Sequence, residues 1–523
     1  MTTESMKDSF SMLQMNQKET TQILLEEDIL VPDTKPDLSK IIFIEGKIKI
    51  MDKNISNDKV NVTGKLQLKI LYTPFSGNEN ATVVPMECNI DFRQEIDCLY
   101  DEKVDIKFIP DIEHIDYNII NERKLKIKVL TNILTKGYET YEVDMIKDEM
   151  NSEMQYLKEQ IKYTDIVQRE KETIDIKEEI GIKDNMPEIG EVLSWDIHIF
   201  ENQRQIVNQR AVINATLQYN IMYLSNEIEP VPVMLEEKSE FTQFIDIKEF
   251  EGSVDSKADF SVEYSNVSIK KDIEDNATLL NMEATIATDL EITKNKEKEI
   301  IIDAYHPMQN IEVEKGEIHY KLLHSKNASD IQVREIINLF DDNKQMENIV
   351  SVQGKVVETN NYVEADKNII EGVLAVHIIY ETETEEGTRK IHGMTDEIPF
   401  RHYIDIKGVG PSYEIEKDFN IRKIDYEKIN NRQIEINSEI FMKSRVYAKE
   451  SHEVLRDVAI QDQEIDFENT PSIIIYIVKK DDNLWKIAKN NRTTIREIEE
   501  TNNIDYESQL VPGQKLILLK SCK

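Results

Sequence analysis

The chain has 523 residues, of which 40% are hydrophobic and 32% charged, with only 15 Gly and 13 Pro. At about 150 residues per domain, this length predicts three to four domains, and the composition excludes collagen-like and low-complexity proteins. Acidic residues outnumber basic ones by 101 to 64, which gives a formal net charge of −37. A chain this acidic repels phosphate backbones and anionic head groups, so we expect neither nucleic acid nor a bare membrane as its primary partner.

The cysteine and histidine content favours a cytosolic protein without a metal site. Cys88, Cys98 and Cys522 are an odd, sparse set rather than a disulfide framework. The sequence contains no CxxC, HExxH, GxSxG or GxxxxGK[ST] motif. Residues 1–20 are polar and lack the apolar core of a secretory signal, and no apolar run reaches 18 residues. We therefore expect no export, no membrane span, no metal and no cofactor.

Three copies of one unit make up most of the chain. Residues 27–72 align without a gap with residues 178–223, at an offset of 151, and with residues 335–380, at a further offset of 157. In the best-matched stretch apolar residues alternate with polar ones and end at a tyrosine, which predicts a half-buried strand with residues such as Lys69 on its other face. The three apolar columns are Leu66, Leu68 and Ile70; Leu217, Tyr219 and Ile221; and Leu374, Val376 and Ile378.

Further matches extend each copy beyond this stretch. One matched set is Phe92, Ile96 and Asp97; Phe241, Ile245 and Asp246; and Phe400, Ile404 and Asp405. Each copy then closes with another alternating strand, marked by Leu125, Ile127 and Val129, by Leu280 and Met282, and by Ile434 and Ile436. Antiparallel sheets with one wet face explain the apolar alternation, so the predicted fold class is mainly β, with three tandem β-sandwich-like repeats. We interpret the repeated aliphatic residues as core, because enzymes seldom need three copies of one site in series.

These matches predict a division of the chain into eight segments. Residues 1–20 are a polar N-terminal tail, 21–145 repeat 1, 146–171 a connector, 172–296 repeat 2, 297–325 a connector, 326–452 repeat 3, 453–472 a linker and 473–523 a C-terminal module. The connectors keep regularly spaced apolar residues such as Ile161 and Val167, so we expect them to be extended or partly helical.

The last segment has a different composition. Residues 476–520 carry eight basic and seven acidic side chains, a charge of about +1 against −38 for the rest of the chain. Asn483 is a good N-cap for a first helix, and Thr494 with Glu497 forms a capping box for a second. With a strand on either side, the segment predicts a small βααβ domain.

The residues of this module resemble those of LysM domains. The resemblance lies in the string Tyr476-Ile-Val-Lys-Lys-Asp-Asp-Asn-Leu-Trp-Lys-Ile-Ala488, in Asn502-Asn503 and in Val511-Pro-Gly-Gln-Lys-Leu516. Two departures are Asp481-Asp482-Asn483 in place of the family's Gly-Asp-Thr, and Asn490-Asn491 near the family's glycine after the first helix, where Asn can adopt the left-handed conformation.

The resemblance implies a binding groove between two loops, since LysM domains generally bind N-acetylglucosamine polymers. The candidate partner-binding or glycan-binding residues in these loops are Asp481, Asp482, Asn483, Leu484, Asn502, Asn503, Leu510, Val511, Pro512 and Gly513. Leu484 and Val511 are expected at the apolar rim of the groove. Trp485 is interpreted as a core residue that packs on the second helix and the last strand, in preference to an exposed interface anchor.

The repeats resemble a second family, the SPOCS-type domains of clostridial endospore formers. The resemblance lies in Asp33-Thr-Lys-Pro-Asp37, in Asp165-Ile-Val167 and in Asp303-Ala-Tyr305 with Pro307. Three such domains followed by a LysM domain are similar to the SipL-type spore-coat morphogenetic proteins. The resemblance implies a non-enzymatic assembly protein in the mother-cell cytoplasm, at the forespore surface. Its implied partners are other coat proteins and the coat basement-layer ATPase, stage IV sporulation protein A, with the LysM domain as the protein-binding element.

Two other functions stay open at this point. The LysM domain is compatible with peptidoglycan binding in the spore envelope, although that role requires access to cell wall and no export signal is visible. A cell-wall hydrolase would need a carboxylate pair, a Cys/His pair or a zinc site. Acidic residues are so abundant here that chance carboxylate pairs are unavoidable, so catalysis is the least favoured interpretation.

Overall fold

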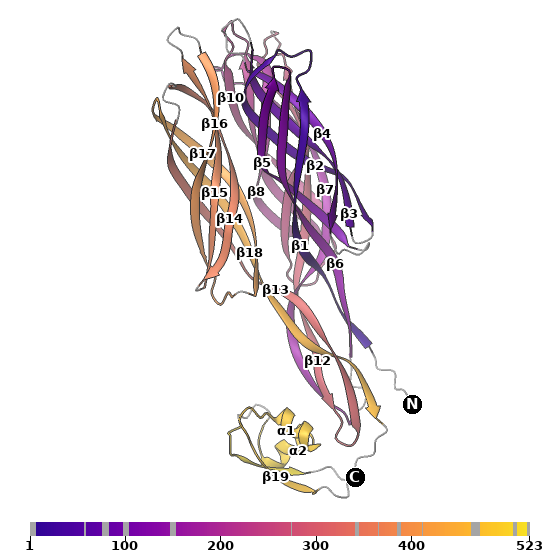
Figure 1. Cartoon of the computed structure of the whole chain (residues 1–523). Coiled ribbons are helices and arrows are strands. Elements are labelled where there is room, and N and C mark those ends of the chain that lie inside the picture. Colours follow the sequence, from indigo (N-terminus) through magenta and orange to yellow (C-terminus); the bar gives the residue numbers. More distant parts are fainter. Residues whose placement is uncertain are drawn as a thin grey trace.

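The computed structural model describes residues 7–56, 59–75, 83–97, 104–146, 153–273, 275–339, 345–364, 366–383, 389–410, 412–461, 471–505 and 510–519. Strands dominate the chain, and three strand bundles lie side by side above a narrower stalk and a small C-terminal module (Figure 1). The expected fold class, three tandem β-sandwich repeats followed by a βααβ module, is confirmed.

Each repeat contributes six strands. Repeat 1 has β1 (Lys7–Leu30), β2 (Leu38–Ser56), β3 (Lys59–Pro74), β4 (Val84–Asp97), β5 (Asp105–Asn121) and β6 (Lys124–Ile146). Repeat 2 has β7 (Gln155–Gly181), β8 (Ile189–Val207), β9 (Arg210–Ser225), β10 (Pro232–Asp246), β11 (Asp255–Lys270) and β12 (Leu279–Tyr305). Repeat 3 has β13 (Asn310–Asn338), β14 (Met346–Glu364), β15 (Lys367–Glu383), β16 (Arg389–Asp405), β17 (Tyr413–Asn430) and β18 (Gln433–Gln461).

Within a repeat the six strands form two antiparallel three-stranded sheets that pack face to face. The long-strand sheets have the orders β1-β6-β5, β7-β12-β11 and β13-β18-β17, and the short-strand sheets have the orders β2-β3-β4, β8-β9-β10 and β14-β15-β16. The apolar columns expected from the sequence lie buried between the two sheets in all three repeats. Hydrophobic burial at period two therefore builds each sandwich core.

A buried tyrosine closes the end of two of these cores. The Tyr72 hydroxyl donates a hydrogen bond to the Pro36 carbonyl at 2.7 Å, and the Tyr223 hydroxyl donates one to the Pro187 carbonyl at 2.9 Å. Burial raises the pKa of Tyr223 to about 12. A buried hydroxyl needs such a partner, so the same tyrosine-to-proline contact holds the loop before β2 and the loop before β8 over their cores.

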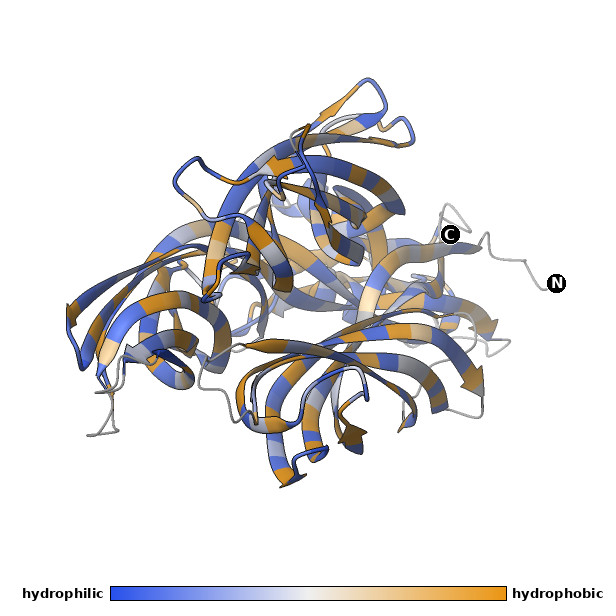
Figure 2. Cartoon of the chain, turned by 90° about the horizontal axis from the view of Figure 1, so that it is seen from above, coloured by the Kyte–Doolittle hydropathy of each residue, from blue (hydrophilic) through white to orange (hydrophobic). Residues whose placement is uncertain are grey.

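The three sandwiches surround a common centre, as the view from above shows (Figure 2). One apolar cluster at this centre combines residues that the sequence alignment makes equivalent in the three repeats. Its equivalent sets are Ile42, Leu193 and Val350, and Leu71, Met222 and Ile379. The repeats are therefore arranged with approximate threefold symmetry, each turning the same face of its short-strand sheet inward.

The stalk follows the same symmetry. The long strands β1, β6, β7, β12, β13 and β18 run beyond the sandwiches, and their far ends share a second apolar cluster. Its equivalent sets are Phe10, Ile161 and Ile318; Met12, Tyr163 and Tyr320; and Met145, Ile300 and Val454.

The segments that were expected to be a tail and connectors are largely strands of the stalk. From Lys7 onward the expected polar tail of residues 1–20 is strand β1, which pairs with β6 and buries Phe10 completely. Most described residues of the expected connectors, 146–171 and 297–325, are extended and belong to β7, β12 and β13. The tail and the first halves of β7 and β13 are equivalent parts of the stalk. The eight-segment division itself stays a proposal.

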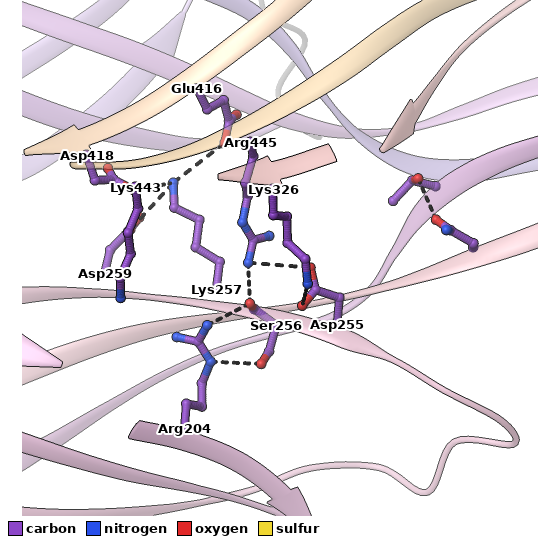
Figure 3. Close-up of polar contacts among 12 residues, drawn as sticks. Arg204, Asp255, Ser256, Lys257, Asp259, Lys326, Glu416, Asp418, Lys443 and Arg445 are labelled. Carbon is purple, nitrogen blue, oxygen red and sulfur yellow. Dashed lines mark hydrogen bonds and ion pairs between the residues drawn. The ribbon is translucent and has the colours of Figure 1, made fainter. Parts of the chain in front are cut away.

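Charged side chains fill the space between repeats 2 and 3 (Figure 3). Lys257 of β11 lies 3.6 Å from Glu416 and 3.8 Å from Asp418, both on β17. Arg445 of β18 reaches Asp255 at 3.6 Å. Burial lowers the pKa of Lys257, but the surrounding carboxylates outweigh it and hold that pKa above its ordinary value. The contact between these repeats is therefore partly ionic.

Candidate functional site

The C-terminal module consists of β19 (Ile473–Ile477), α1 (Leu484–Asn491), α2 (Ile495–Asn502) and β20 (Lys515–Leu519). Strands β19 and β20 pair antiparallel, with Ile475 opposite Ile517. Asn483 caps α1 by accepting a hydrogen bond from the backbone of Lys486 at 2.8 Å. Both expected helix starts are thus confirmed, including the capping box at the start of α2.

The helix ends differ from the sequence expectation. Arg492, and not Asn490 or Asn491, adopts the left-handed conformation after α1, with φ of 53°. Asn503 adopts it after α2, with φ of 57°. Asn491 instead donates its side-chain amide to the Ile487 carbonyl at 2.8 Å. The helix is one residue longer than the asparagine pair suggests, so the left-handed position falls on the next residue.

The expectation that Leu484 lines the rim of the groove is wrong. Leu484 is only 3% exposed and lies in the module's core with Ile487, Ile498 and Leu516. Leu484 belongs to the apolar stripe of the amphipathic helix α1, and this stripe packs on the inner side of the sheet. Leu510 is half-buried and packs on the same core.

Trp485 is buried, as expected, but its neighbours include residues outside the module. It is 6% exposed, and its ring packs edge-on against Tyr305 at the end of β12, with 4.9 Å between ring centroids. Its indole Nε1 donates a hydrogen bond to Asp303 Oδ2 at 2.9 Å. Trp485 therefore joins the module to the stalk.

Further polar contacts reinforce this junction. Lys489 Nζ lies 2.7 Å from Asp303, and the Tyr305 hydroxyl donates to the Thr493 carbonyl at 2.8 Å. Burial raises the pKa of Asp303, but the hydrogen bonds from Lys489 and Trp485 outweigh this effect and hold it below its ordinary value. Asp303 is therefore the ionised centre of the contact. No sequence signal connected it with Trp485, because the two residues lie 182 positions apart.

Several candidate loop residues are committed to holding the module's own backbone. Asp482 accepts hydrogen bonds from the Tyr476 hydroxyl at 2.9 Å and the Lys479 backbone at 2.8 Å. Asn502 both accepts from and donates to the backbone of Ile517, at 2.6 and 2.7 Å. Their polar groups set the shape of the two loops, and are already partnered there.

The remaining candidates lie at the surface. Asp481, Asn483 and Asn503 are exposed, as are Val511, Pro512 and Gly513 in the turn before β20. Gly513 has φ of 92°, a conformation that favours glycine. Val511 is 61% exposed and supplies an apolar group beside Pro512. The loops therefore offer a shallow surface with one carboxylate and one apolar edge.

An apolar surface that the candidate list missed covers the outer face of β19 and β20. We call it the outer face; its members are Ile473, Ile475, Ile477, Ile517 and Leu519. Ile475 is 67% exposed and its cross-strand neighbour Ile517 is 44% exposed. The alternation of Ile473, Ile475 and Ile477 was the signal that the sequence offered for this face.

The residues that the structure describes contain neither a candidate metal cluster nor a candidate membrane-spanning helix. No group of three His, Cys, Asp or Glu side chains is placed there to hold a metal ion. None of the described helices is long and apolar enough to span a membrane.

Comparison with known families gives two matches that together cover more than half of the chain. The family model described as SipL, SPOCS domain, matches residues 37–120, 188–270 and 345–429, and the LysM domain model matches residues 476–518. No curated protein and no solved structure matches the chain. SPOCS and LysM domains are non-catalytic binding domains, and their combination supports a sporulation-related, peptidoglycan-binding role. The chain belongs to the SipL family, with three SPOCS domains in tandem ahead of a C-terminal LysM domain.

Proposed function

We propose that this protein is a non-enzymatic scaffold that helps to assemble and localise the spore coat around the forespore, from the mother-cell cytoplasm. In this proposal its LysM domain binds the coat basement-layer ATPase, stage IV sporulation protein A. The three sandwiches and the stalk hold that domain at one end of a long molecule (Figure 1). Other coat proteins are further proposed partners.

The outer face is the observation that carries the proposal. Five large apolar side chains lie exposed together on two short strands, and such a patch, larger than scattered single residues, is typical of a protein-binding surface. The module is nearly neutral within a chain of net charge −37, so it can approach an acidic protein with little repulsion. Both helices lie against the opposite side of the sheet, so this face has no intramolecular cover in the described residues.

Binding of N-acetylglucosamine polymers is the second candidate function. It is supported by the match to the LysM domain and by the exposed groups of Asp481, Val511 and Pro512 in the two groove loops. The loops and the outer face share no residue, so the two functions make separable predictions. A cell-wall hydrolase is the least supported alternative.

Variants of the outer face test the proposal. Ile475→Glu together with Ile517→Glu places two carboxylates on side chains that are already exposed, so the module's core is left intact. We expect co-purification with stage IV sporulation protein A to fall by more than tenfold, because an interface of modest area depends on a few desolvated contacts. Val511→Glu is the matched control: it alters an equally exposed apolar residue of the groove and should leave protein binding unchanged.

The glycan function is measured on the same proteins with insoluble chitin and peptidoglycan. Two results together would move the assignment to a glycan-binding protein. The glycan would retain the wild-type chain but not Val511→Glu, and the outer-face variant would bind the ATPase as well as the wild type does. Full ATPase binding by both variants would show that neither surface is the contact.

A further inference from the structure

Repeat 1 has an open groove at the seam between its two sheets. One wall is Glu27–Leu30 of β1, and the other is Met86–Asp91 of β4. The groove has a volume of about 440 Å³. Each wall is the outer strand of its sheet, so half of its backbone N–H and C=O groups point away from the ladder and into the seam. A run of consecutive residues on each side is what an added strand would contact.

In repeat 2 side chains fill the equivalent seam between the two sheets. Its Tyr219 occupies the position equivalent to Leu68, and its Ser239 the position equivalent to Ile90. The Tyr219 hydroxyl lies 2.9 Å from Ser239 Oγ on β10 and also contacts Glu178 on β7. The tyrosine therefore bridges the two edge strands of repeat 2. In repeat 1 the shorter Leu68 is completely buried and leaves the seam above it open.

The rim of the repeat 1 groove is acidic. Asp28 is paired with Lys124 at 2.7 Å, and Asp91 lies 3.6 Å from Lys65. Glu27 and Glu87 are exposed, and neither forms an ion pair within 4 Å in the described part of the chain. Lys69 lies opposite Glu87 on β3 and attracts it from a longer distance. Two acidic edges repel each other, so this rim disfavours a second copy of the same groove and favours a cationic occupant.

We propose that this groove binds an extended, basic segment of a partner protein by strand addition. Backbone hydrogen bonds to an edge strand supply affinity that does not depend on sequence, and alternate side chains supply specificity. Lysine or arginine side chains on one face of the segment meet the outward carboxylates of Glu87 and Asp91. Apolar side chains on its other face meet Met86 and Ile90, with Glu27 across the seam on that inner face. The site is independent of the LysM domain, so a fully functional LysM domain neither supports nor weakens it.

A synthetic probe tests the groove on the full-length protein. The probe is a fluorescent octapeptide of alternating Val and Lys, measured by fluorescence polarisation against an octapeptide of alternating Val and Glu. The decisive variant is Leu68→Tyr with Ile90→Ser, which copies the filled seam of repeat 2 and keeps every charge. We expect the Lys peptide to bind the wild type at least tenfold more tightly than the filled variant, and the Glu peptide to bind neither.

If the Lys peptide bound both proteins equally, its binding would depend only on the net negative charge of the protein and not on the open groove, which would overturn the proposal. Failure of the Lys peptide to bind the wild type at millimolar concentration would overturn it too. Cys88 gives a second measurement that needs no core substitution, because its half-buried thiol lines the groove. In a Cys98→Ser, Cys522→Ser chain, saturating Lys peptide should slow alkylation of Cys88 at least fivefold. An unchanged rate would place the peptide elsewhere.

Discussion

The indole of Trp485 donates a hydrogen bond to the carboxylate of Asp303 across the junction between the LysM domain and the stalk, at 2.9 Å. Lys489, one helical turn later, binds the same carboxylate at 2.7 Å. The domain is thus docked on the end of β12 through its first helix. Because that docking uses the helix side, the outer face of β19 and β20 stays free for a partner.

We predict that Trp485→Ala destabilises the LysM domain by about 3–5 kcal/mol, the usual cost of removing a buried aromatic side chain. Trp485→Phe keeps a buried aromatic ring but removes the N–H donor and part of the indole volume, so it should cost less than Trp485→Ala but more than about 1 kcal/mol. Denaturant unfolding of the full-length chain, monitored by proteolytic cleavage at the junction, measures the loss of stability in both variants.

The isolated domain, residues 473–523, is the control for this prediction. There Trp485 loses Tyr305 and Asp303, so Trp485→Ala should cost less than in the full chain. Equal costs in the two settings would mean that Trp485 contributes nothing to docking.

The sequence was sufficient to predict the sandwich cores and the βααβ module. Apolar residues at period two, repeated at fixed offsets, leave one face for the core, as Ile70, Ile221 and Ile378 show. The stalk was not predictable by the same means. Phe10 and its equivalents Ile161 and Ile318 lie outside the aligned window, among charged residues that are typical of tails and connectors.

Only part of the candidate site could be predicted. Capping residues such as Asn483 act on neighbours three positions away, so local sequence was enough to place them. The burial of Leu484 depends on which side of a short helix meets the sheet, and the role of Asp303 depends on a contact between distant segments. Tertiary packing determines both the burial of Leu484 and the role of Asp303, and no local sequence motif predicts that packing.

We predict that aspartate at Ile70, Ile221 or Ile378 unfolds the repeat that carries it. Each side chain is almost fully buried on the inner face of its strand, so the substitution buries a charge with no partner. Limited proteolysis of each variant should release the affected repeat.

Gln67 is the matched control for Ile70, because it is exposed on the same strand. Lys69, expected on the solvent face, is unsuitable: its ammonium donates to the Trp195 carbonyl at 3.1 Å and lies 3.4 Å from the centre of the Trp195 ring. Burial between repeats 1 and 2 lowers the pKa of Lys69. Equal protease resistance of Gln67→Asp and Ile70→Asp chains would refute the strand register.

We predict that Lys257→Met destabilises the contact between repeats 2 and 3 by about 1–3 kcal/mol, because it removes a largely buried cation and leaves the half-buried Glu416 without it. The affected groups are Glu416 and Asp418 (Figure 3). Lys177→Met is the control, since Lys177 pairs with Glu283 at 2.7 Å at an exposed position and should change stability by less than about 1 kcal/mol. Urea unfolding of both variants measures the difference, and similar midpoints would contradict the prediction.

The last prediction concerns pH and His377, which lies between repeats 1 and 3. Its ring packs against Phe43 of repeat 1, with 4.5 Å between ring centroids. Burial lowers the pKa of His377 to about 4, although a hydrogen bond to the backbone of Ile42 favours the charged form. The folded protein therefore keeps this ring neutral at pH values where an unfolded chain would protonate it.

In the unfolded chain the ring titrates near its ordinary pKa of about 6.5. Between about pH 6.5 and 4 the unfolded state binds a proton that the folded state does not, so stability falls as the pH falls through this window. The shift corresponds to a loss of about 3 kcal/mol at its lower end. His377→Gln keeps a donor for the Ile42 carbonyl but cannot titrate, so its unfolding free energy should decline less over the same range. Denaturant unfolding at pH 7, 6, 5 and 4 measures the two slopes, and parallel slopes for wild type and variant would show that His377 does not carry the pH dependence.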